Sequence, residues 1–141
     1  MLPEKLVLDV VTPERRLLTR DVEEVVLPGS EGYLGVRPGH TPLLTALGVG
    51  ILSWKGANMV GAIAVSKGYA EILPDRVSVL AQIAELEEEI DIDRAEEARE
   101  RAEKMLAHAG DPHLDFEQAR GALERARNRV AVATRSRAGR T

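Results

Sequence analysis

The chain of 141 residues contains no cysteine and few aromatic residues, which make up 3% of it. The missing thiols exclude disulfides, a cysteine nucleophile and cysteine-ligated zinc, and they fit a reducing compartment. The shortage of aromatic side chains leaves a core of Val, Leu, Ile and Ala, and argues against a sugar-binding protein or a sandwich enzyme. Uninterrupted apolar stretches such as Met59–Val65 fall short of the roughly 18 residues that a membrane-spanning helix needs. We therefore expect no direct membrane insertion.

Enzyme motifs are missing as well. The sequence has no glycine-lysine phosphate loop, no HExxH, no G-x-S-x-G elbow and no dinucleotide-binding glycine pattern. Its three histidines, His40, His108 and His113, do not stand at metal-ligand spacing with acidic residues. The net charge of −4 gives no reason to expect nucleic acid as a partner. The first residues lack the basic start and apolar stretch of a signal peptide. We expect a non-catalytic protein that binds no metal and is not exported by that route.

Residues 1–86 consist of short Val-, Leu- and Ile-rich runs separated by turn signals such as "PGSEG", "KGAN" and "PDR". This pattern predicts about nine short strands between residues 5 and 82, including separate strands at 41–47, 50–54, 59–65 and 69–73. So many short strands favour an antiparallel β-sandwich, because two packed sheets bury the apolar faces. The first predicted domain is this sandwich.

Residues 87–141 change to a helical period, which predicts a second domain with two helices. We expect Asp93 to cap the first helix, with Glu96 completing a capping box, and Asp115 and Gln118 to repeat the pattern on the second. The "AGDPHLD" stretch between them makes the pair a hairpin. Its seam is rich in alanine and therefore weak. The predicted seam residues are Ala95, Ala98, Ala102, Met105, Phe116, Ala119, Leu123, Ala126, Val130 and Ala133.

The stretch "GYLGVRPGHTPLL" at 32–44 has three glycines and two prolines around His40. One interpretation is a structural turn in which His40 binds a backbone group, and the other is a contact surface. The sequence leaves both open.

Five segments in matching order resemble the epsilon subunit of F-type ATP synthase in its bacterial form. They are "LDVVTPERRLL", "EGYLGVRPGHTPLLTAL", "VSKGYAEILPDRVSVLAQIAE" and the two helical stretches "IDIDRAEEARERAEK" and "ALERARNRVAV". The resemblance covers nearly the whole chain. It implies a sandwich of ten strands followed by a two-helix hairpin, in agreement with the pattern of the residues.

The resemblance also implies a role in the rotor. Members of the family sit at the foot of the central stalk, bind the gamma subunit and the c-ring, and support the coupling of proton transport to ATP synthesis. These contacts would lie in the loop 31–40, at Glu31, Tyr33 and His40. Tyr33 stands where an acidic residue is frequent in the family, and Arg37 where an apolar or aromatic one is usual. The implied location is the cytoplasmic face of the bacterial cell membrane, as a peripheral part of the ATP synthase.

In bacterial members the hairpin either folds against the sandwich or extends into the alpha/beta catalytic hexamer, where it inhibits ATP hydrolysis. A basic second helix suits contact with acidic surfaces of that hexamer. The alternative is that these arginines pair with the acidic first helix. The arginines concerned are Arg120, Arg125, Arg127, Arg129, Arg135 and Arg137.

The family also suggests a regulatory ATP site, and the chain needs no other cofactor. Some bacterial members bind ATP through a motif of Ile or Leu, Asp, two variable residues, Arg and Ala, which matches 90–95 here. Arginine spacing supports a cluster, because arginines one or two turns apart share a helix face and guanidinium groups suit a triphosphate. The alternatives are local pairs of Arg94 or Arg101 with Glu97, or a stand-alone ATP-sensing module. The matching residues are Glu85, Ile90, Asp91, Arg94, Ala95, Arg101, Arg125 and Arg129.

Overall fold

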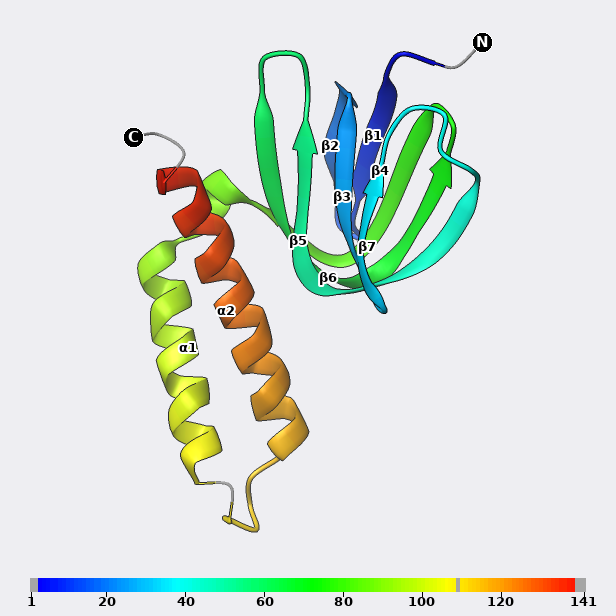
Figure 1. Cartoon of the computed structure of the whole chain (residues 1–141). Coiled ribbons are helices and arrows are strands. Elements are labelled where there is room, and N and C mark those ends of the chain that lie inside the picture. Colours follow the sequence, from blue (N-terminus) through cyan, green and yellow to red (C-terminus); the bar gives the residue numbers. More distant parts are fainter. Residues whose placement is uncertain (1–2, 109, 139–141) are drawn as a thin grey trace.

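The structure is a computed structural model that describes residues 3–108 and 110–138, with side chains through residue 135. Seven strands come first: β1 (Leu6–Val11), β2 (Arg16–Val22), β3 (Glu24–Gly29), β4 (Gly32–Val36), β5 (Leu43–Lys55), β6 (Val60–Leu73) and β7 (Arg76–Leu86). A short turn of 3₁₀ helix, η1 (Glu87–Glu89), leads to α1 (Ile92–Ala107) and α2 (Phe116–Ala138). Figure 1 shows the strands wrapped around one core and the two helices standing beside them as an antiparallel pair. The predicted fold class, a β-sandwich followed by a helical hairpin, is confirmed.

The strands form one continuous sheet in the order β2-β1-β7-β6-β5-β3-β4. Neighbouring strands are antiparallel except for β1 and β7, which are parallel. The sheet curves so that its two ends face each other across the core (Figure 1). Aliphatic residues that are fully buried fill the space between, among them Leu6, Leu27, Leu52, Ile63 and Val77.

The prediction of nine or ten short strands is wrong in number, because two pairs of predicted strands are continuous. β5 runs unbroken through Gly48, and β6 runs through Lys67 and Gly68. At Lys67 and Gly68 the backbone takes positive φ angles of 61° and 131°, while the pairing with β7 resumes on either side. The glycine signals therefore mark a local distortion inside a long strand, in the manner of a β-bulge.

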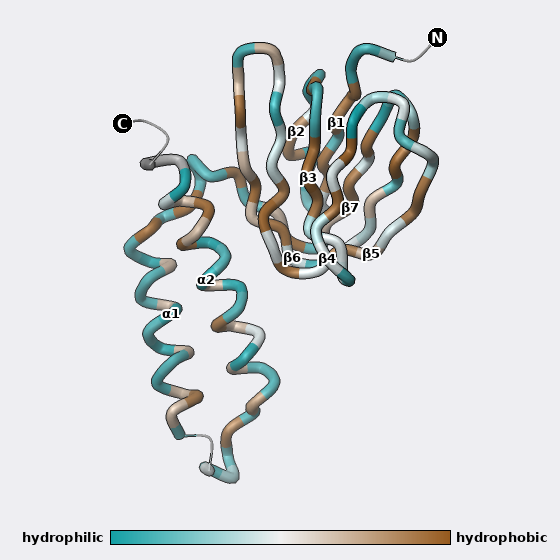
Figure 2. Tube along the Cα trace, in the orientation of Figure 1, coloured by the Kyte–Doolittle hydropathy of each residue, from teal (hydrophilic) through white to brown (hydrophobic). Residues whose placement is uncertain are grey.

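The helices differ from the sandwich in how much apolar surface they carry. Figure 2 shows apolar residues throughout the strands but only scattered apolar positions along largely hydrophilic helices. The seam between α1 and α2 consists mainly of small side chains, as predicted, but Met105 and Phe116 are about half exposed at the far end of the hairpin. No helix in the described part of the chain is long and apolar enough to cross a bilayer.

The N-terminal caps agree with the prediction for only one of the two helices. Asp115 accepts a hydrogen bond from the Gln118 amide at 3.0 Å, so the predicted cap of α2 is confirmed. The predicted cap of α1 at Asp93 is wrong. The side chain of Asp91 caps the helix instead, and it accepts a hydrogen bond of 3.2 Å from the Arg94 amide. The helix thus starts two residues earlier than expected, because the first suitable side-chain oxygen after the linker belongs to Asp91.

Candidate functional site

The helical hairpin lies against the outer surface of the sheet through α2, which contacts β5, β6 and η1. The apolar part of this contact is a small cluster in which alanines of β6 meet residues of the linker and both helices. Small side chains let the helix approach the sheet closely but bury little area, so the contact is weak for its extent. The buried members are Ala62, Ala64, Ile90, Ala95, Val132 and Ala133.

Polar contacts lie next to this cluster. The Arg129 guanidinium pairs with the Glu85 carboxylate through two oxygens, with Nε 2.8 Å from Oε1 and Nη2 3.2 Å from Oε2. Asn128 donates a hydrogen bond of 2.7 Å from Nδ2 to the Gly50 carbonyl. Both side chains belong to α2 and both partners belong to the sandwich, so these contacts fix the rotation of α2 on the sheet.

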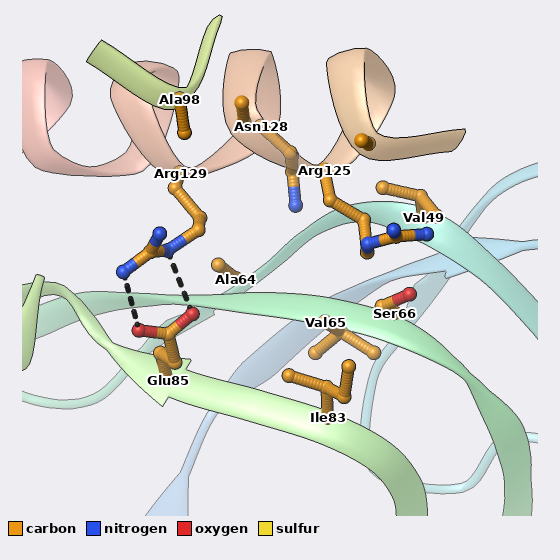
Figure 3. Close-up of a pocket in the computed structure, with 12 residues that line it drawn as sticks. Val49, Ala64, Val65, Ser66, Ile83, Glu85, Ala98, Arg125, Asn128 and Arg129 are labelled. Atoms are coloured by element: carbon orange, nitrogen blue, oxygen red, sulfur yellow. Dashed lines mark hydrogen bonds and ion pairs between the residues drawn. The ribbon is translucent and has the colours of Figure 1, made fainter. Parts of the chain in front are cut away.

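A cavity of about 280 Å³ remains between α2, the sheet and Ala98 of α1. Figure 3 shows Arg129, Asn128 and Arg125 descending from α2 toward β6 and β7, with Glu85 opposite Arg129. The wall on the sheet side is largely apolar apart from Ser66 and Glu85. The volume lies at the low end of small-molecule sites, so a whole nucleoside triphosphate enters only if the cavity opens.

The predicted nucleotide residues divide into two groups. Glu85, Arg125 and Arg129 line the cavity. Arg94 and Arg101 of α1 are exposed and do not line it. The structure therefore brings together three of the predicted polar residues and leaves the two α1 arginines outside.

The remaining residues of the 90–95 motif have structural roles. Ile90 is buried in the apolar cluster, Asp91 caps α1, and Ala95 is fully buried against α2. Each stabilises the fold of the hairpin with or without a ligand.

Sequence reasoning missed Asn128 and Ser66 as cavity residues. Asn128 carried one usable signal: it follows Arg125 by three positions on α2, so the two share a helix face. Ser66 carried none, since an isolated serine in a strand is usually an exposed residue.

Some of the charged side chains on the two helices form ion pairs within the chain. Arg127 lies 3.7 Å from Glu103 of α1, and Arg99 lies 3.9 Å from the same carboxylate. The local pairs with Glu97 are not among the ion pairs of the described residues. The Glu85 carboxylate pairs with Arg129 and so reduces the repulsion between Arg129 and Arg125. The side chain of Arg137 lies outside the described residues.

The linker is tied to the sandwich by Arg15, in the turn after β1. Its Nη2 donates a hydrogen bond of 2.6 Å to Glu89 of η1. This hydrogen bond lowers the pKa of the Glu89 carboxyl below its ordinary value of 4.5, with the charge of Arg15 adding to the effect. The pair favours the linker position seen here at neutral pH.

The loop 31–40, predicted to touch partners, has mixed roles. Glu31 is exposed in the turn between β3 and β4. Tyr33 is 63% exposed, yet its hydroxyl accepts a hydrogen bond of 3.0 Å from the Ile51 amide. His40 is half-buried, and its Nδ1 donates to the Thr41 carbonyl at 2.6 Å, as the structural interpretation predicts.

A second surface was missed by sequence reasoning. The outer strip, defined as Leu44, Tyr69 and Leu80, presents large apolar side chains that are 70%, 60% and 62% exposed. Strand pairing places them on one face, because Tyr69 lies opposite Leu80 and Leu44 lies opposite Glu71, two residues along from Tyr69. The strip continues the same sheet face that α2 covers further along. Alternation of apolar residues could not reveal it, since Leu80 shares the outer face of β7 with the polar Ser78.

Comparison with known protein families matches both halves of the chain. Residues 5–87 match the β-sandwich domain of the ATP synthase delta/epsilon chain, and residues 88–134 match its long α-helix domain. The ATP synthase epsilon chain of Syntrophobacter fumaroxidans is 47% identical over 94% of this chain and 98% of its own length. That of Halalkalibacterium halodurans is 44% identical over 90% of this chain and 96% of its own length.

Solved structures show the same fold. A chain of the Euglena gracilis mitochondrial ATP synthase, in a structure of OSCP, F1 and c-ring, superimposes with a TM-score of 0.80 and 24% identity, over 93% of this chain and 82% of that one. A chain from the central stalk and c-ring of the Tetrahymena thermophila mitochondrial ATP synthase superimposes with a TM-score of 0.57 and 15% identity, over 96% of this chain and 98% of that one. At these identities the likeness concerns the fold alone.

Proposed function

Because the chain belongs to the ATP synthase delta/epsilon family, we propose that it is a non-catalytic rotor subunit, attached through its sandwich and regulatory through its hairpin. In this role it links the gamma subunit to the c-ring, supports coupling of proton transport to ATP synthesis, and restrains ATP hydrolysis. Its place is the cytoplasmic face of the bacterial cell membrane, held there by its partners. The observation that carries the regulatory part is the weak contact between α2 and the sheet, made of alanines and two polar links.

The outer strip supports attachment to gamma. Exposed apolar residues gathered on one sheet face are typical of a surface that a partner covers. Glu31 and Tyr33 lie with Leu43 and Leu44 around a shallow hollow between β4 and β5, which extends this surface toward the predicted c-ring contacts. The half-buried His40, whose ring already binds a backbone carbonyl, contributes less.

The hairpin supports regulation because it can leave the sheet at modest cost. Release exposes the alanines and Val132 of the cluster together with the partly buried Ile51 and Val130. It also breaks the Arg129 to Glu85 pair and frees Asn128. The exposed face of α2 carries Arg120, Arg127 and Arg135, which suit acidic surfaces of the alpha/beta hexamer. The docked hairpin would then permit hydrolysis and the extended hairpin would restrain it.

ATP is the proposed ligand that favours the docked hairpin. Arg125 and Arg129 face the sheet in the cavity and offer guanidinium groups to phosphate oxygens. Glu85 occupies Arg129 in the structure, so a phosphate must compete with this carboxylate.

The test of attachment and inhibition uses an ATPase core purified without its epsilon subunit. The full chain should bind the core through gamma and lower the rate of ATP hydrolysis, whereas a chain lacking residues 87–141 should bind without inhibiting. Failure of the full chain to bind would contradict the rotor assignment. Binding without any change in rate would contradict the inhibitory part alone.

Calorimetric titration of the isolated chain with ATP and ADP, with and without magnesium, tests the ligand. Heat of binding for ATP that is lost in Arg125→Ala supports the nucleotide site, with Arg120→Ala as a control outside the cavity. A chain that binds ATP but has no affinity for the core would instead be a stand-alone ATP-sensing module.

A further inference from the structure

One peptide group in the middle of β5 is held from two directions by residues far apart in sequence. The Ile51 amide donates to the Tyr33 hydroxyl at 3.0 Å, and the Gly50 carbonyl accepts from Asn128 at 2.7 Å. These are the N–H and the C=O of the same peptide unit. Tyr33 belongs to β4 and Asn128 belongs to α2, so a single peptide joins the β3–β4 edge of the sandwich to the helical hairpin.

Strand pairing explains why the N–H of this peptide is available. The ladder between β3 and β5 is interrupted between the pairs Val26 to Ser53 and Gly29 to Leu47. The interruption leaves the stretch 48–52 of β5 without partners in β3, and the Ile51 amide bonds the Tyr33 hydroxyl instead. The Gly50 carbonyl points to the other side of the strand, where β5 pairs with β6 and α2 lies above the sheet.

The packing around the peptide is tight. A side chain on Gly50 would lie 2.5 Å from the Pro28 Cβ and 2.8 Å from the Tyr33 hydroxyl. Glycine is therefore required at this position, and the phenol of Tyr33 limits where the peptide can sit.

We propose that Tyr33 and Asn128 are coupled positioning residues, and that Tyr33 strengthens docking of the hairpin through the Gly50–Ile51 peptide. A hydrogen bond at a peptide N–H polarises the group and makes its C=O a better acceptor, so the two bonds reinforce each other. Tyr33 also holds the carbonyl in the position that Asn128 reaches. Neither residue touches the other, and the peptide transmits the effect.

The coupling gives the β3–β4 edge a means to influence the hairpin. Tyr33 is 63% exposed, so a partner that covers β4 and turns the phenol away from Ile51 would break that bond and weaken the bond from Asn128. This consequence rests on the proposed function, since it needs a partner at β4. The coupling itself does not, and the experiment below uses the isolated full chain without partner or nucleotide.

The experiment is a double-mutant cycle on hairpin docking. Because the chain has no cysteine, the exposed residues Asn58 and Gln118 can each be changed to cysteine and labelled. The distance between the two labels, one in the turn between β5 and β6 and one on α2, then reports the ratio of docked to undocked chains. We expect Asn128→Ala to lower this ratio about fivefold, the worth of a typical hydrogen bond. Tyr33→Phe should lower it about twofold through weaker polarisation. In the double variant the ratio of docked to undocked chains should equal that of Asn128→Ala alone. A ratio lowered by the product of the two single effects would overturn the coupling.

Amide hydrogen exchange supplies a second readout once undocking itself is controlled for, because Ile51 packs against the cluster beneath the hairpin. Exchange of the Ile51 amide should accelerate more in Asn128→Ala than in Val132→Ala, which weakens docking without removing a bond to the Gly50–Ile51 peptide. Ile51 exchange that is no faster in Asn128→Ala than in Val132→Ala would also overturn the proposal. Tyr69→Phe, an equally exposed tyrosine on the outer strip, is the matched control and should leave both docking and Ile51 exchange unaltered.

Discussion

Replacing Val132 with alanine should release the hairpin from the sheet. Val132 is completely buried in the cluster formed with Ala62, Ala64 and Ala95. The substitution removes two carbons, worth about 0.8 kcal/mol each when buried. Alanine neighbours cannot extend to refill the space, so the cost is not recovered by repacking. Some of this burial persists between the helices after release, which leaves about 1 kcal/mol against docking, or about a fivefold lower ratio of docked to undocked chains.

The assay is the labelled distance between the sandwich and α2, measured in the full chain at several temperatures. Val60→Ala is the matched control, because it removes the same atoms from a side chain that is 72% exposed at the start of β6. The control should change docking by less than about twofold. A Val132→Ala chain that docks as well as the wild type would refute the reasoning, and would place the docking energy in the polar links of Glu85 and Gly50.

Two further predictions concern the start of the hairpin. Asp91→Ala should destabilise α1 by about 1 kcal/mol through loss of its cap, whereas Asp93→Ala should cost only a few tenths through the helix dipole, both measured by urea unfolding; equal costs would count against Asp91 as the cap. Arg15→Ala should raise the Glu89 pKa toward 4.5, as followed by NMR titration of the carboxyl. Because the folded-state pKa is lowered, the stabilisation by Arg15 is present above pH 4.5 and is lost as the pH falls through the lower folded value, so the stability difference between wild type and variant should shrink in acid. A Glu89 pKa unchanged by the substitution would contradict this origin.

The division into a sandwich and a hairpin could be predicted from the sequence because it depends on local periodicity. The parallel pairing of β1 with β7 could not, since it joins Val7 to Arg76 across most of the sandwich, and alternation within a strand carries no information on its partner. The two merged strands were missed for a related reason. Gly48 and Gly68 are turn signals by composition, but pairing with a long neighbour decides whether the chain turns or only bends.

Within the candidate site, prediction succeeded for Glu85 of β7 and for the arginines of α2, but not for those of α1. Helical spacing places Arg125 and Arg129 on one face, and the structure turns that face to the sheet. Which face of α1 points there depends on how the hairpin is rotated, and that rotation is set by contacts such as the one between Asn128 and Gly50. Because these contacts are formed between the two domains, helix periodicity alone could not place Arg94 and Arg101.

The placement of the four arginines leads to a graded prediction for nucleotide affinity. Arg125 lies in the cavity of the docked hairpin. If ATP binds there, Arg125→Ala should weaken ATP binding about tenfold or more, since a charge-assisted hydrogen bond is worth roughly 1.5–3 kcal/mol. Arg101 is exposed outside the cavity, and its loss should matter little. Glu85→Gln should tighten binding, because it frees Arg129 from the carboxylate that holds it at 2.8 Å. Calorimetry with the three variants decides the matter. Equal losses in Arg101→Ala and Arg125→Ala would mean that the nucleotide binds a hairpin rotated away from the arrangement described here. Weaker binding in Glu85→Gln, with docking of the hairpin unchanged, would make Glu85 a nucleotide ligand rather than a competitor for Arg129.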